Sequence, residues 1–426
     1  MIFNLPYGKE QIEINIDANI DIEVINPKRV KPASNYLDLL DQALENPINA
    51  KPFTELVSGG NKKIIFVIDD YTRKFPNKLI IPPILKKLKN LGVKNEDISF
   101  IMACGTHGEP TSDHLDELFT INGKFFLGDC TLYCNNVHSS EFEYMGETSR
   151  DVPIEINKEY LRADVRILLT DVEYHYYAGF GGGRKSILPG VSSESTISKN
   201  HAFLIDPNSK TGNLEGNPVH LDMLEVAEKI GADLVINVVK TLDNKILDIK
   251  AGAINDAFLE AVKIYDSNNR IKLDKKADMV ILSAGGFPKD INLYQALKGV
   301  EHCRRALKNN GYMFFIAECS EGIGHKVFDE WMVKYNTLEK VKNQVVNAFK
   351  MGGHKVYYLL MAKNQTAHIF LYSKISKDET ENKFLLDYIE NPDDLNRKIN
   401  DIIDKKNINS IYIIPHSKDL LIEANE

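Results

Sequence analysis

Short apolar runs alternate with helical patterns along the whole chain, and this alternation constrains the fold more than any other feature. The apolar runs have the length of single strands, and β-branched residues are frequent in them, which is typical of strands buried on both faces. A helical pattern such as 82–92 follows the first run. Strand–helix alternation predicts an α/β fold with mainly parallel sheets and helices on their faces. The predicted strands are 62–70, 97–107, 165–175, 232–239, 277–286, 311–319, 367–373 and 410–415.

A polar, charged stretch at 268–276 predicts a domain boundary. We therefore expect two α/β domains with a cofactor cleft between them. The first is an N-terminal domain over 1–270 and the second a C-terminal domain over 275–405, and the segment 406–426 is expected to return to the N-terminal domain. The first 17 residues read as a strand hairpin, and 374–383 as a solvated surface segment.

Charge and composition exclude several classes of protein. The net charge of −8 argues against a nucleic-acid partner, whose binder would be basic, and gives no reason to expect an anionic membrane surface. No apolar run approaches the roughly 18 residues of a membrane span. The first residues are acidic where a signal peptide would be basic, so we expect a cytoplasmic enzyme with a small-molecule substrate, monomeric or homo-oligomeric.

The five cysteines are an odd number and are scattered, which suits a reducing compartment better than a disulfide framework. Cys130 and Cys134 have a spacing that could begin a zinc site, with His138 close by. No second pair follows them, so the interpretation as buried or incidental thiols is preferred.

Four polar residues come just after predicted strands: Asp70, Arg73, His107 and His175. In parallel α/β sheets, ligands bind outside the carboxyl ends of the strands. This shared position predicts that the four side chains belong to one site.

The segment 178–190, AGFGGGRKSILPG, carries a glycine-rich loop before Lys185. Gly179–Ser186 fits the phosphate-binding pattern G-x-x-x-x-G-K-[ST] except that Arg184 stands where the second glycine belongs. Pro189 would also fall within the first turns of the helix that such a loop opens. Arg184 can serve an anionic group or be a plain surface charge.

Lys185 lies between His175 and His201 in the sequence, and a helical reading places His201 past the loop. A neutral histidine can bind a metal such as nickel or zinc, two histidines can exchange protons near neutral pH, and a lysine can form a covalent link to a cofactor. The residues alone therefore predict a covalent-lysine or anion site framed by histidines, in a cleft between domains.

The chain resembles the lactate racemase family through five motifs in order. They are DDYTR (69–73), GTH (105–107), H-x-x-AGFGGGRK-x-I-x-PG (175–190), NH (200–201) and NLYQALKG (292–299), with GETSRDVP (146–153) and AECSEGIGH (317–325) as further similar segments. The resemblance implies two α/β domains and, between them, a nickel pincer nucleotide. This cofactor is a pyridinium mononucleotide that binds nickel through two sulfurs and a ring carbon.

The resemblance also implies a role for individual residues. Lys185 would carry the cofactor covalently, His201 would bind nickel, and His107 and His175 would be the acid/base pair. The remaining matches are cofactor-binding residues Asp70, Thr72, Arg73, Gly182 and Gly183, and substrate-binding residues Arg73, Tyr294, Gln295 and Lys298. On this reading the glycines admit the cofactor, and Asp70 either holds its ribose or orients a neighbouring base.

The implied activity is a racemase or epimerase that inverts C2 of lactate or a related 2-hydroxy acid. It would do so by proton-coupled hydride transfer through a 2-oxo acid, with cofactor-biosynthesis proteins as partners. The alternatives are a nucleotide-dependent enzyme of the P-loop type and a non-catalytic nickel or cofactor carrier. Both His107 and His175 are present, which argues against a carrier, because a carrier needs only ligands.

The sequence departs from the lactate-active members in the region that faces the substrate. Those members carry a tryptophan there, whereas Trp331 stands in a different context and the comparable region is FKMGGHKVYYLLM (349–361). This region reads as an amphipathic helix. Alternatively, His354 or Lys355 reaches a polar or second acidic group on a larger substrate.

Overall fold

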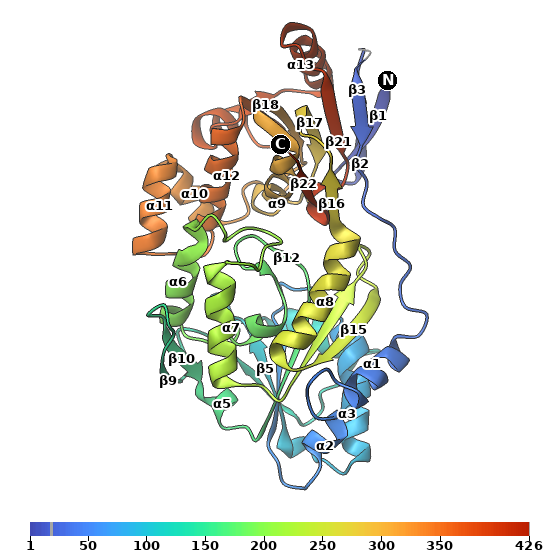
Figure 1. Ribbon diagram of the computed structural model, residues 1–426, viewed down its shortest axis with the longest axis vertical. Coiled ribbons are helices and arrows are strands. Elements are labelled where there is room, and N and C mark those ends of the chain that lie inside the picture. The colour runs from blue at the N-terminus through green and yellow to red at the C-terminus, as the bar shows by residue number, and fades with distance from the viewer. Residues whose placement is uncertain (18–19, 426) are drawn as a thin grey trace. The chain divides into compact units, whose positions relative to one another are not determined.

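The structure is a computed structural model that describes residues 1–17 and 20–425 (Figure 1). The chain divides into two compact units: a middle unit, Arg29–Ser267, and a terminal unit, formed by Met1–Lys28 together with the chain from Asn268 onward. Each unit is built on a six-stranded, mainly parallel sheet. The predicted α/β class is confirmed.

The sheet of the middle unit has the strand order β15-β14-β11-β4-β5-β8. Every neighbouring pair is parallel except β14 and β15, which are antiparallel. The strands are β4 (Ile64–Asp69), β5 (Ile98–Ala103), β8 (Thr131–Cys134), β11 (Val165–Asp171), β14 (Leu234–Lys240) and β15 (Ile246–Gly252).

Strand β4 shows why these runs form central strands. Ile64 to Ile68 are all buried, as expected where both faces of a parallel sheet are covered. One face packs against α1, α2 and α3, which contribute Leu44, Phe53 and Ile84 to the core. The 3-10 turn Gly183–Ser186 contacts β4, β11 and β14, so the glycine-rich loop lies against the sheet.

The other elements of the middle unit connect these strands. Its helices are α1 (Tyr36–Glu45), α2 (Phe53–Val57), α3 (Asn77–Asn90), α4 (Ser112–Phe119), α5 (Lys158–Leu161), α6 (Glu194–Ala202), α7 (Pro218–Ile230) and α8 (Ile254–Asn269). Its short strand pairs are β6 (Thr120–Ile121) with β7 (Lys124–Phe125), β9 (Phe142–Glu147) with β10 (Pro153–Asn157), and β12 (Tyr174–His175) with β13 (Gly179–Phe180).

The terminal unit has an all-parallel sheet in the order β20-β19-β18-β17-β21-β3. Its strands are β3 (Asp21–Val24), β17 (Ala277–Ser283), β18 (Leu307–Ile316), β19 (His368–Tyr372), β20 (Asp387–Ile389) and β21 (Ser410–Ile414). Also in this unit are the hairpin β1 (Ile2–Tyr7) and β2 (Glu10–Asn15), and the parallel pair β16 (Arg270–Leu273) and β22 (Leu421–Ala424). The helices are α9 (Leu293–Cys303), α10 (Lys326–Lys334), α11 (Leu338–Asn347), α12 (Gly353–Gln365) and α13 (Pro392–Lys405).

The domain boundaries predicted at the two chain ends are wrong. Residues 1–28 were assigned to the N-terminal domain, but β3 joins the sheet of the terminal unit beside β21. The segment 406–426 was expected to return to the N-terminal domain, but β21 and β22 also belong to the terminal unit. Pairing between strands so distant in sequence leaves no trace in local periodicity. The N-terminal hairpin has the predicted form, and the unit boundary at 267/268 coincides with the start of the polar stretch.

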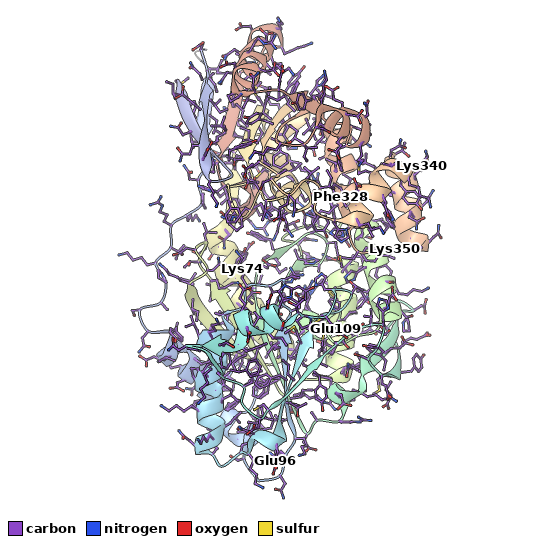
Figure 2. All side chains as sticks on the ribbon, turned by 180° about the vertical axis from the view of Figure 1, so that it is seen from behind. Lys74, Glu96, Glu109, Phe328, Lys340 and Lys350 are labelled. Carbon is purple, nitrogen blue, oxygen red and sulfur yellow. The ribbon has the colours of Figure 1, made fainter. Side chains whose placement is uncertain are left out.

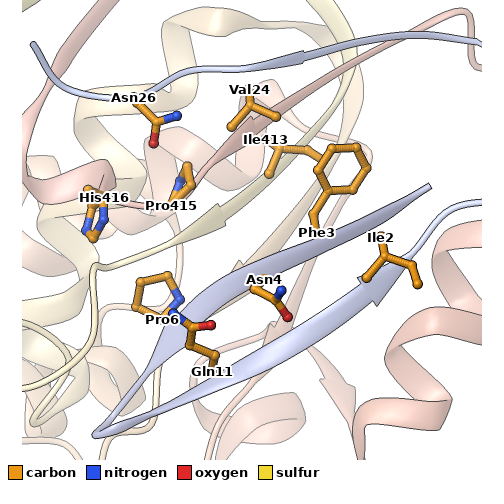
Figure 3. A pocket seen from close by; sticks show the side chains of 10 residues that line it. All are labelled: Ile2, Phe3, Asn4, Pro6, Gln11, Val24, Asn26, Ile413, Pro415 and His416. Carbon is orange, nitrogen blue, oxygen red and sulfur yellow. The ribbon is translucent and has the colours of Figure 1, made fainter.

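The segment 374–383 is mostly exposed, although Ile375 and Thr380 are buried. A cavity of about 370 Å³ opens in the terminal unit between the N-terminal hairpin and the edge formed by β3 and β21 (Figure 3). It is lined by Ile2, Phe3, Asn4, Pro6, Gln11, Val24, Asn26, Ile413, Pro415 and His416. Across residues 1–17 and 20–425, no helix has both the length and the apolar character needed to cross a membrane.

Candidate active site

The carboxyl ends of the neighbouring strands β4 and β5 place Asp70 close to His107. Asp70 follows β4 directly, and its backbone carbonyl accepts a hydrogen bond from the Arg73 N–H at 2.9 Å. The loop after β5 turns at Gly105, and the His107 N–H donates to the Cys104 carbonyl at 2.8 Å. Two tight turns therefore bring the two side chains together at one edge of the sheet.

The carboxylate of Asp70 orients the imidazole of His107. Asp70 Oδ2 lies 2.9 Å from His107 Nδ1, and Oδ1 accepts the Thr72 N–H at 2.6 Å. Burial raises the pKa of Asp70, but the hydrogen bond from His107 and the charge of Arg73 outweigh it, and the pKa falls to about 2. Asp70 is therefore ionised and accepts the Nδ1 proton of His107, which leaves Nε2 as the basic nitrogen.

A second carboxyl, Asp69, behaves oppositely. Burial and the charge of Asp171 raise its pKa well above the usual range. Thr170 Oγ1 donates to it at 3.1 Å, while Asp171 forms an ion pair with Lys240. The pKa values of these adjacent carboxyls are thus shifted in opposite directions. The opposite pKa shifts of Asp69 and Asp70 were not predicted from the sequence. The only available signal was that both aspartates stand at the end of a predicted strand.

Arg73 is half-exposed, and its guanidinium lies 3.4 Å from the carboxylate of Glu173. Burial lowers the pKa of Arg73, but the nearby charges of Glu173 and Asp70 outweigh this effect, so that the net change is upward. Glu173 was not predicted as a site residue. Thr72, by contrast, is exposed and contributes its backbone N–H to Asp70.

The glycine-rich loop does not open a helix. After β13 the chain forms a single 3-10 turn, Gly183–Ser186, and the next α-helix, α6, begins only at Glu194. A P-loop needs a helix N-terminus directly behind its lysine, since that terminus binds the phosphates. The loop geometry therefore argues against the P-loop alternative.

Lys185 sits on this turn with a half-buried side chain. Burial is the largest cause of a pKa well below the usual range for Lys185, and the positive charges of Arg73 and Arg184 lower it further. The negative charges of Glu173 and Asp69 oppose this shift without reversing it. A lysine amine is a nucleophile only when it is neutral. The surroundings of Lys185 therefore favour the form of the amine that can become covalently attached.

The glycines of the loop are explained by contacts within the protein itself. A Cβ at Gly182 would lie 2.9 Å from Val172, and one at Gly183 would lie 2.8 Å from Phe258. Both glycines also have positive φ, 98° and 51°. Close packing therefore requires glycine here, and contact with a cofactor remains a prediction.

Arg184 is a buried structural residue, so the expectation of a plain surface charge was wrong. Its side chain is fully buried, stacks over the Phe258 ring at 4.1 Å, and donates to the carbonyls of Ala178 at 2.8 Å and Gly182 at 3.1 Å. Its Nε donates to His220 Nδ1 at 3.0 Å. Burial lowers its pKa to about 9. The guanidinium thus ties the two ends of the glycine-rich loop together.

His201 is buried near the end of α6, whose first turn is capped by Ser193. Burial and the charge of Lys185 lower its pKa to about 3, so the imidazole is neutral. Its Nδ1 lies 3.1 Å from Asn200 Oδ1. The Asn200 amide is held in that orientation because its Nδ2 donates to the Val219 carbonyl at 3.1 Å and to Asp222 Oδ2 at 2.9 Å.

This chain of hydrogen bonds sets the tautomer of His201. Asn200 can offer only its oxygen to the ring, so Nδ1 carries the proton and Nε2 the lone pair. Metal-binding histidines commonly donate their other ring N–H to an oxygen in this way. Asn200 and Asp222 are positioning residues that the sequence did not reveal as such, apart from Asn200 preceding His201 in the NH motif.

His175 ends β12, and its Nδ1 accepts the Ala178 N–H at 3.3 Å. Its ring packs edge-on against Tyr177 at 4.6 Å, and Tyr177 packs edge-on against His201 at 5.0 Å. His175 is thus linked to the Lys185 and His201 region through one aromatic ring. The middle unit assembles six predicted residues: Asp70, Arg73, His107, His175, Lys185 and His201.

The predicted substrate residues lie in the terminal unit on helix α9. Asn292 caps the helix by accepting the Gln295 N–H at 3.0 Å. Tyr294 and Lys298 are four residues apart and share one helix face. Tyr294 stacks on His325 at 4.6 Å, while Gln295 is exposed.

Helix α12 is not amphipathic, so that expectation was wrong. Gly353 to Leu360 are all buried, including His354 and Lys355. Lys355 Nζ lies 5.0 Å from the centre of the Tyr294 ring, and the His354 ring lies 6.2 Å from it. The two residues singled out in the sequence therefore surround a predicted substrate residue.

The cysteines form no zinc site in the part of the chain that the structure describes, where no cluster of three or more histidine, cysteine or acidic side chains could hold a metal. Cys134 instead lies 2.9 Å from Cys104, Sγ to Sγ. The nearby Glu109, on the loop between β5 and α4 (Figure 2), accepts the Asn136 amide at 2.7 Å.

Comparison with known proteins agrees with this arrangement. Family models match in both units: the lactate racemase N-terminal domain over residues 7–212 and the lactate racemase C-terminal domain over 272–417. The lactate racemase of Thermoanaerobacterium thermosaccharolyticum is 31% identical over 351 residues, 80% of each chain. That of Lactiplantibacillus plantarum is 31% identical over 356 residues, 81% of each chain.

Solved structures show the same relationship. The lactate racemase apoprotein from T. thermosaccharolyticum superposes with a TM-score of 0.84 at 26% identity, covering 99% of this chain and 100% of that chain. A protein from Thermotoga maritima shares the fold, with a TM-score of 0.65 at 16% identity, 91% of this chain and 98% of that one.

The two α/β units, with mainly parallel sheets, and the lactate racemases matched along the chain identify an α/β enzyme of the isomerase class, a racemase. With both family models matched along its length, the chain belongs to the lactate racemase family.

Proposed function

We propose that this racemase inverts C2 of a 2-hydroxy acid with a nickel pincer nucleotide attached to Lys185. The observation that carries the proposal is the burial of His201 near Lys185, with Nδ1 of His201 3.1 Å from Asn200 Oδ1 so that Nε2 keeps a lone pair. Burial and nearby positive charge lower the pKa of both Lys185 and His201. A lysine that forms a thioamide and a histidine that binds a metal must both be deprotonated, so these residues fit the cofactor.

When bound, the cofactor would supply a centre that takes the C2 hydride and returns it to either face. The chain's own residues handle the proton of the hydroxyl group. Asp70 keeps Nδ1 of His107 protonated, so its Nε2 can accept that proton. His175 would serve the other enantiomer, and its Nδ1, which accepts the Ala178 N–H, fixes the ring. A positioned acid/base of this kind contributes about 10²–10⁴-fold in rate.

The substrate carboxylate is assigned to Lys298, with Tyr294 and Gln295 beside it on α9 and Arg73 as a second candidate. An ammonium or guanidinium group binds a carboxylate through charge-assisted hydrogen bonds. Thr72, Gly182 and Gly183 are assigned to the cofactor together with Asp70 and Arg73. For Asp70, the hydrogen bond to His107 favours orienting the base over holding a ribose.

The attachment is tested on protein from its native host, or from a host that also makes the cofactor. Intact mass spectrometry should show a covalent adduct, located on Lys185 by peptide mapping, and metal analysis should find nickel. Protein that racemises 2-hydroxy acids without adduct or nickel would refute the cofactor assignment.

The mechanism is tested with a substrate deuterated at C2 and racemised in ordinary water. A hydride held as a C–H bond does not exchange with water, so both enantiomers should keep most of the label. If a histidine removed the C2 hydrogen as a proton, the label would wash out. Complete washout during early turnover would refute hydride transfer while leaving the racemase intact.

A further inference from the structure

Two cysteines of the middle unit lie in near contact beside the turn that carries His107. Cys104 follows strand β5 directly, and Cys134 is the last residue of the neighbouring parallel strand β8. Both are free thiols, and their sulfur atoms are 2.9 Å apart. A disulfide bond holds its sulfurs about 2.05 Å apart, so a movement of about 1 Å would join the pair.

The backbone on the Cys134 side is fixed. The next residue, Asn135, is fully buried, and its N–H donates to the Met102 carbonyl of β5 at 3.0 Å. Its side-chain amide donates to the carbonyls of Gly190 at 3.0 Å and Ser192 at 3.2 Å. The end of β8 is therefore tied both to β5 and to the segment between the glycine-rich loop and α6, so its backbone has little freedom to move.

The Cys104 side is the beginning of the turn that presents His107. The Cys104 N–H donates to the Met102 carbonyl at 2.9 Å, and the Cys104 carbonyl accepts the His107 N–H at 2.8 Å. Gly105, inside this turn, has a φ of 54°. Because β8 is fixed, closing the gap between the sulfurs draws Cys104 toward β8. The tight turn transmits that displacement to His107, whose Nδ1 lies 2.9 Å from Asp70 Oδ2.

The two thiols differ in their access to solvent. Cys134 is half-buried on β8, which is an edge strand of its sheet, whereas Cys104 is only 2% exposed. The hydrogen bond between the thiols lowers the pKa of Cys134 against the effect of burial, and the same bond together with burial raises the pKa of Cys104. The thiolate is the reactive form of cysteine. An oxidant from solvent therefore meets Cys134 first, with Cys104 in place as the second, resolving thiol.

We infer that Cys104 and Cys134 are a redox modification site, which a peroxide converts to a reversible disulfide that displaces the turn carrying His107 and slows turnover. Formation of the bond does not depend on the proposed function. The effect on turnover rests on it, because His107 is there assigned as an acid/base residue.

The reaction takes two steps. The Cys134 thiolate sulfur bonds to one peroxide oxygen, the O–O bond breaks, and the released hydroxide is protonated to water, which leaves a sulfenic acid on Cys134. The Cys104 sulfur then bonds to the Cys134 sulfur, the S–O bond breaks, and the departing hydroxide takes the proton of the Cys104 thiol. Two thiols thus lose two electrons to form one disulfide, and the peroxide is reduced to two waters. A dithiol reverses the bond by thiol–disulfide exchange.

The first experiment follows the bond without an activity measurement. Protein purified under reducing conditions is treated with hydrogen peroxide, quenched with catalase, alkylated in denaturant and digested. Peptide mapping should find the Cys104 peptide joined to the Cys134 peptide, and dithiothreitol should separate them. Cys130 is the internal control, because burial raises its pKa to about 11 and its thiol should remain available for alkylation. Absence of the joined peptide, or a sulfinic acid on Cys134 in its place, overturns the inference.

The second experiment measures racemisation by the loaded enzyme before oxidation, after oxidation and after reduction. Misplacing a group at a reacting centre by 1 Å can cost about 10²-fold in rate, so we expect kcat to fall at least about tenfold on oxidation and to recover on reduction. Cys134→Ser should match the reduced wild type and keep its kcat in peroxide. Cys130→Ala is the matched control and should respond to peroxide as the wild type does. If Cys134→Ser does not fold, Cys104→Ala takes its place.

The outcomes separate this inference from the proposed function. A disulfide that leaves kcat unchanged overturns the inference, as does an equal loss of kcat in wild type and Cys134→Ser, which would place the damage on the cofactor; the proposed function stands in both cases. A reduced, nickel-loaded enzyme that racemises no 2-hydroxy acid refutes the proposed function. The displacement is then read from the imidazole NMR signal of His107 in isotope-labelled protein, assigned with His107→Gln. That signal should shift between the reduced and oxidised forms, and an unchanged signal overturns the inference.

Discussion

Replacing Asp70 by asparagine tests whether this carboxylate sets the tautomer of His107. The two oxygens of Asp70 accept from the Thr72 N–H at 2.6 Å and from His107 Nδ1 at 2.9 Å. Asparagine has only one acceptor oxygen. If that oxygen stays with Thr72, the amide N–H₂ faces His107, Nδ1 must accept, and the ring proton moves to Nε2. Nε2 then cannot take a proton from the substrate.

The magnitude follows from the charge interactions of Asp70. Lowering its pKa from 3.8 to about 2 corresponds to about 2 kcal/mol in favour of the carboxylate, which the neutral amide loses. Loss of a correctly protonated base costs about 10²–10⁴-fold in turnover. We therefore expect kcat of Asp70→Asn to fall by at least 100-fold, as measured by chiral chromatography of the racemised substrate at matched nickel and adduct content.

Asp69→Asn is the matched control. Burial and the charge of Asp171 raise the pKa of Asp69, so the neutral amide replaces a carboxyl whose charged form is disfavoured. We expect its kcat to stay within about threefold of wild type, as for other substitutions that preserve hydrogen bonding. Equal losses in the two variants, or full turnover in loaded Asp70→Asn, would show that the orientation of His107 does not depend on Asp70.

The same pair predicts a pH dependence of stability. The folded-state pKa of Asp70 is depressed, so its contribution is fully present above the unfolded pKa near 3.9 and is lost as the pH falls toward 2. The free energy of unfolding in urea should therefore differ between wild type and Asp70→Asn by about 2 kcal/mol at pH 6, and the difference should shrink between pH 4 and pH 2. A difference that does not change with pH would contradict the assignment.

Three further predictions concern the glycine-rich loop and helix α6. Lys185→Ala should lose the covalent adduct and activity together, and Lys185→Arg should not restore them, because a guanidinium cannot form the thioamide; an adduct in the alanine variant would contradict this. His201→Ala should lower nickel affinity by at least about 10–100-fold, as measured by metal analysis. Asn200→Ala no longer fixes the ring tautomer of His201 and should lower the affinity by a similar factor, while the covalent adduct on Lys185 remains. Arg184→Met should keep the apolar stem but lose three hydrogen bonds, and we expect it to lower the free energy of unfolding by about 2–4 kcal/mol. The control Lys199→Met, on the exposed side of α6, should change the free energy of unfolding by less than about 0.5 kcal/mol.

The sequence by itself determined the α/β class and most strands. Runs such as 62–70 are apolar on both faces, and only a strand covered on both sides buries such a run. Polar residues at the ends of these runs could be assigned to one site because parallel strands end at the same edge of a sheet. This reasoning was sufficient for Asp70 and His107, which hydrogen bond in the structure.

Tertiary structure alone decided which distant segments and side chains meet. The N-terminal strand β3 joins the sheet of the terminal unit because it pairs with β21, almost 400 residues away, and no local pattern encodes that partner. Arg184 is charged and stands in a glycine-rich loop, so its sequence suggested an anion or solvent; only the structure shows it buried over Phe258. Helix α9 contacts both α12 and the 3-10 turn Ser417–Asp419, which is much later in the sequence. Periodicity follows from local backbone geometry, whereas the electrostatic environment of a side chain depends on neighbours that only the folded chain brings together.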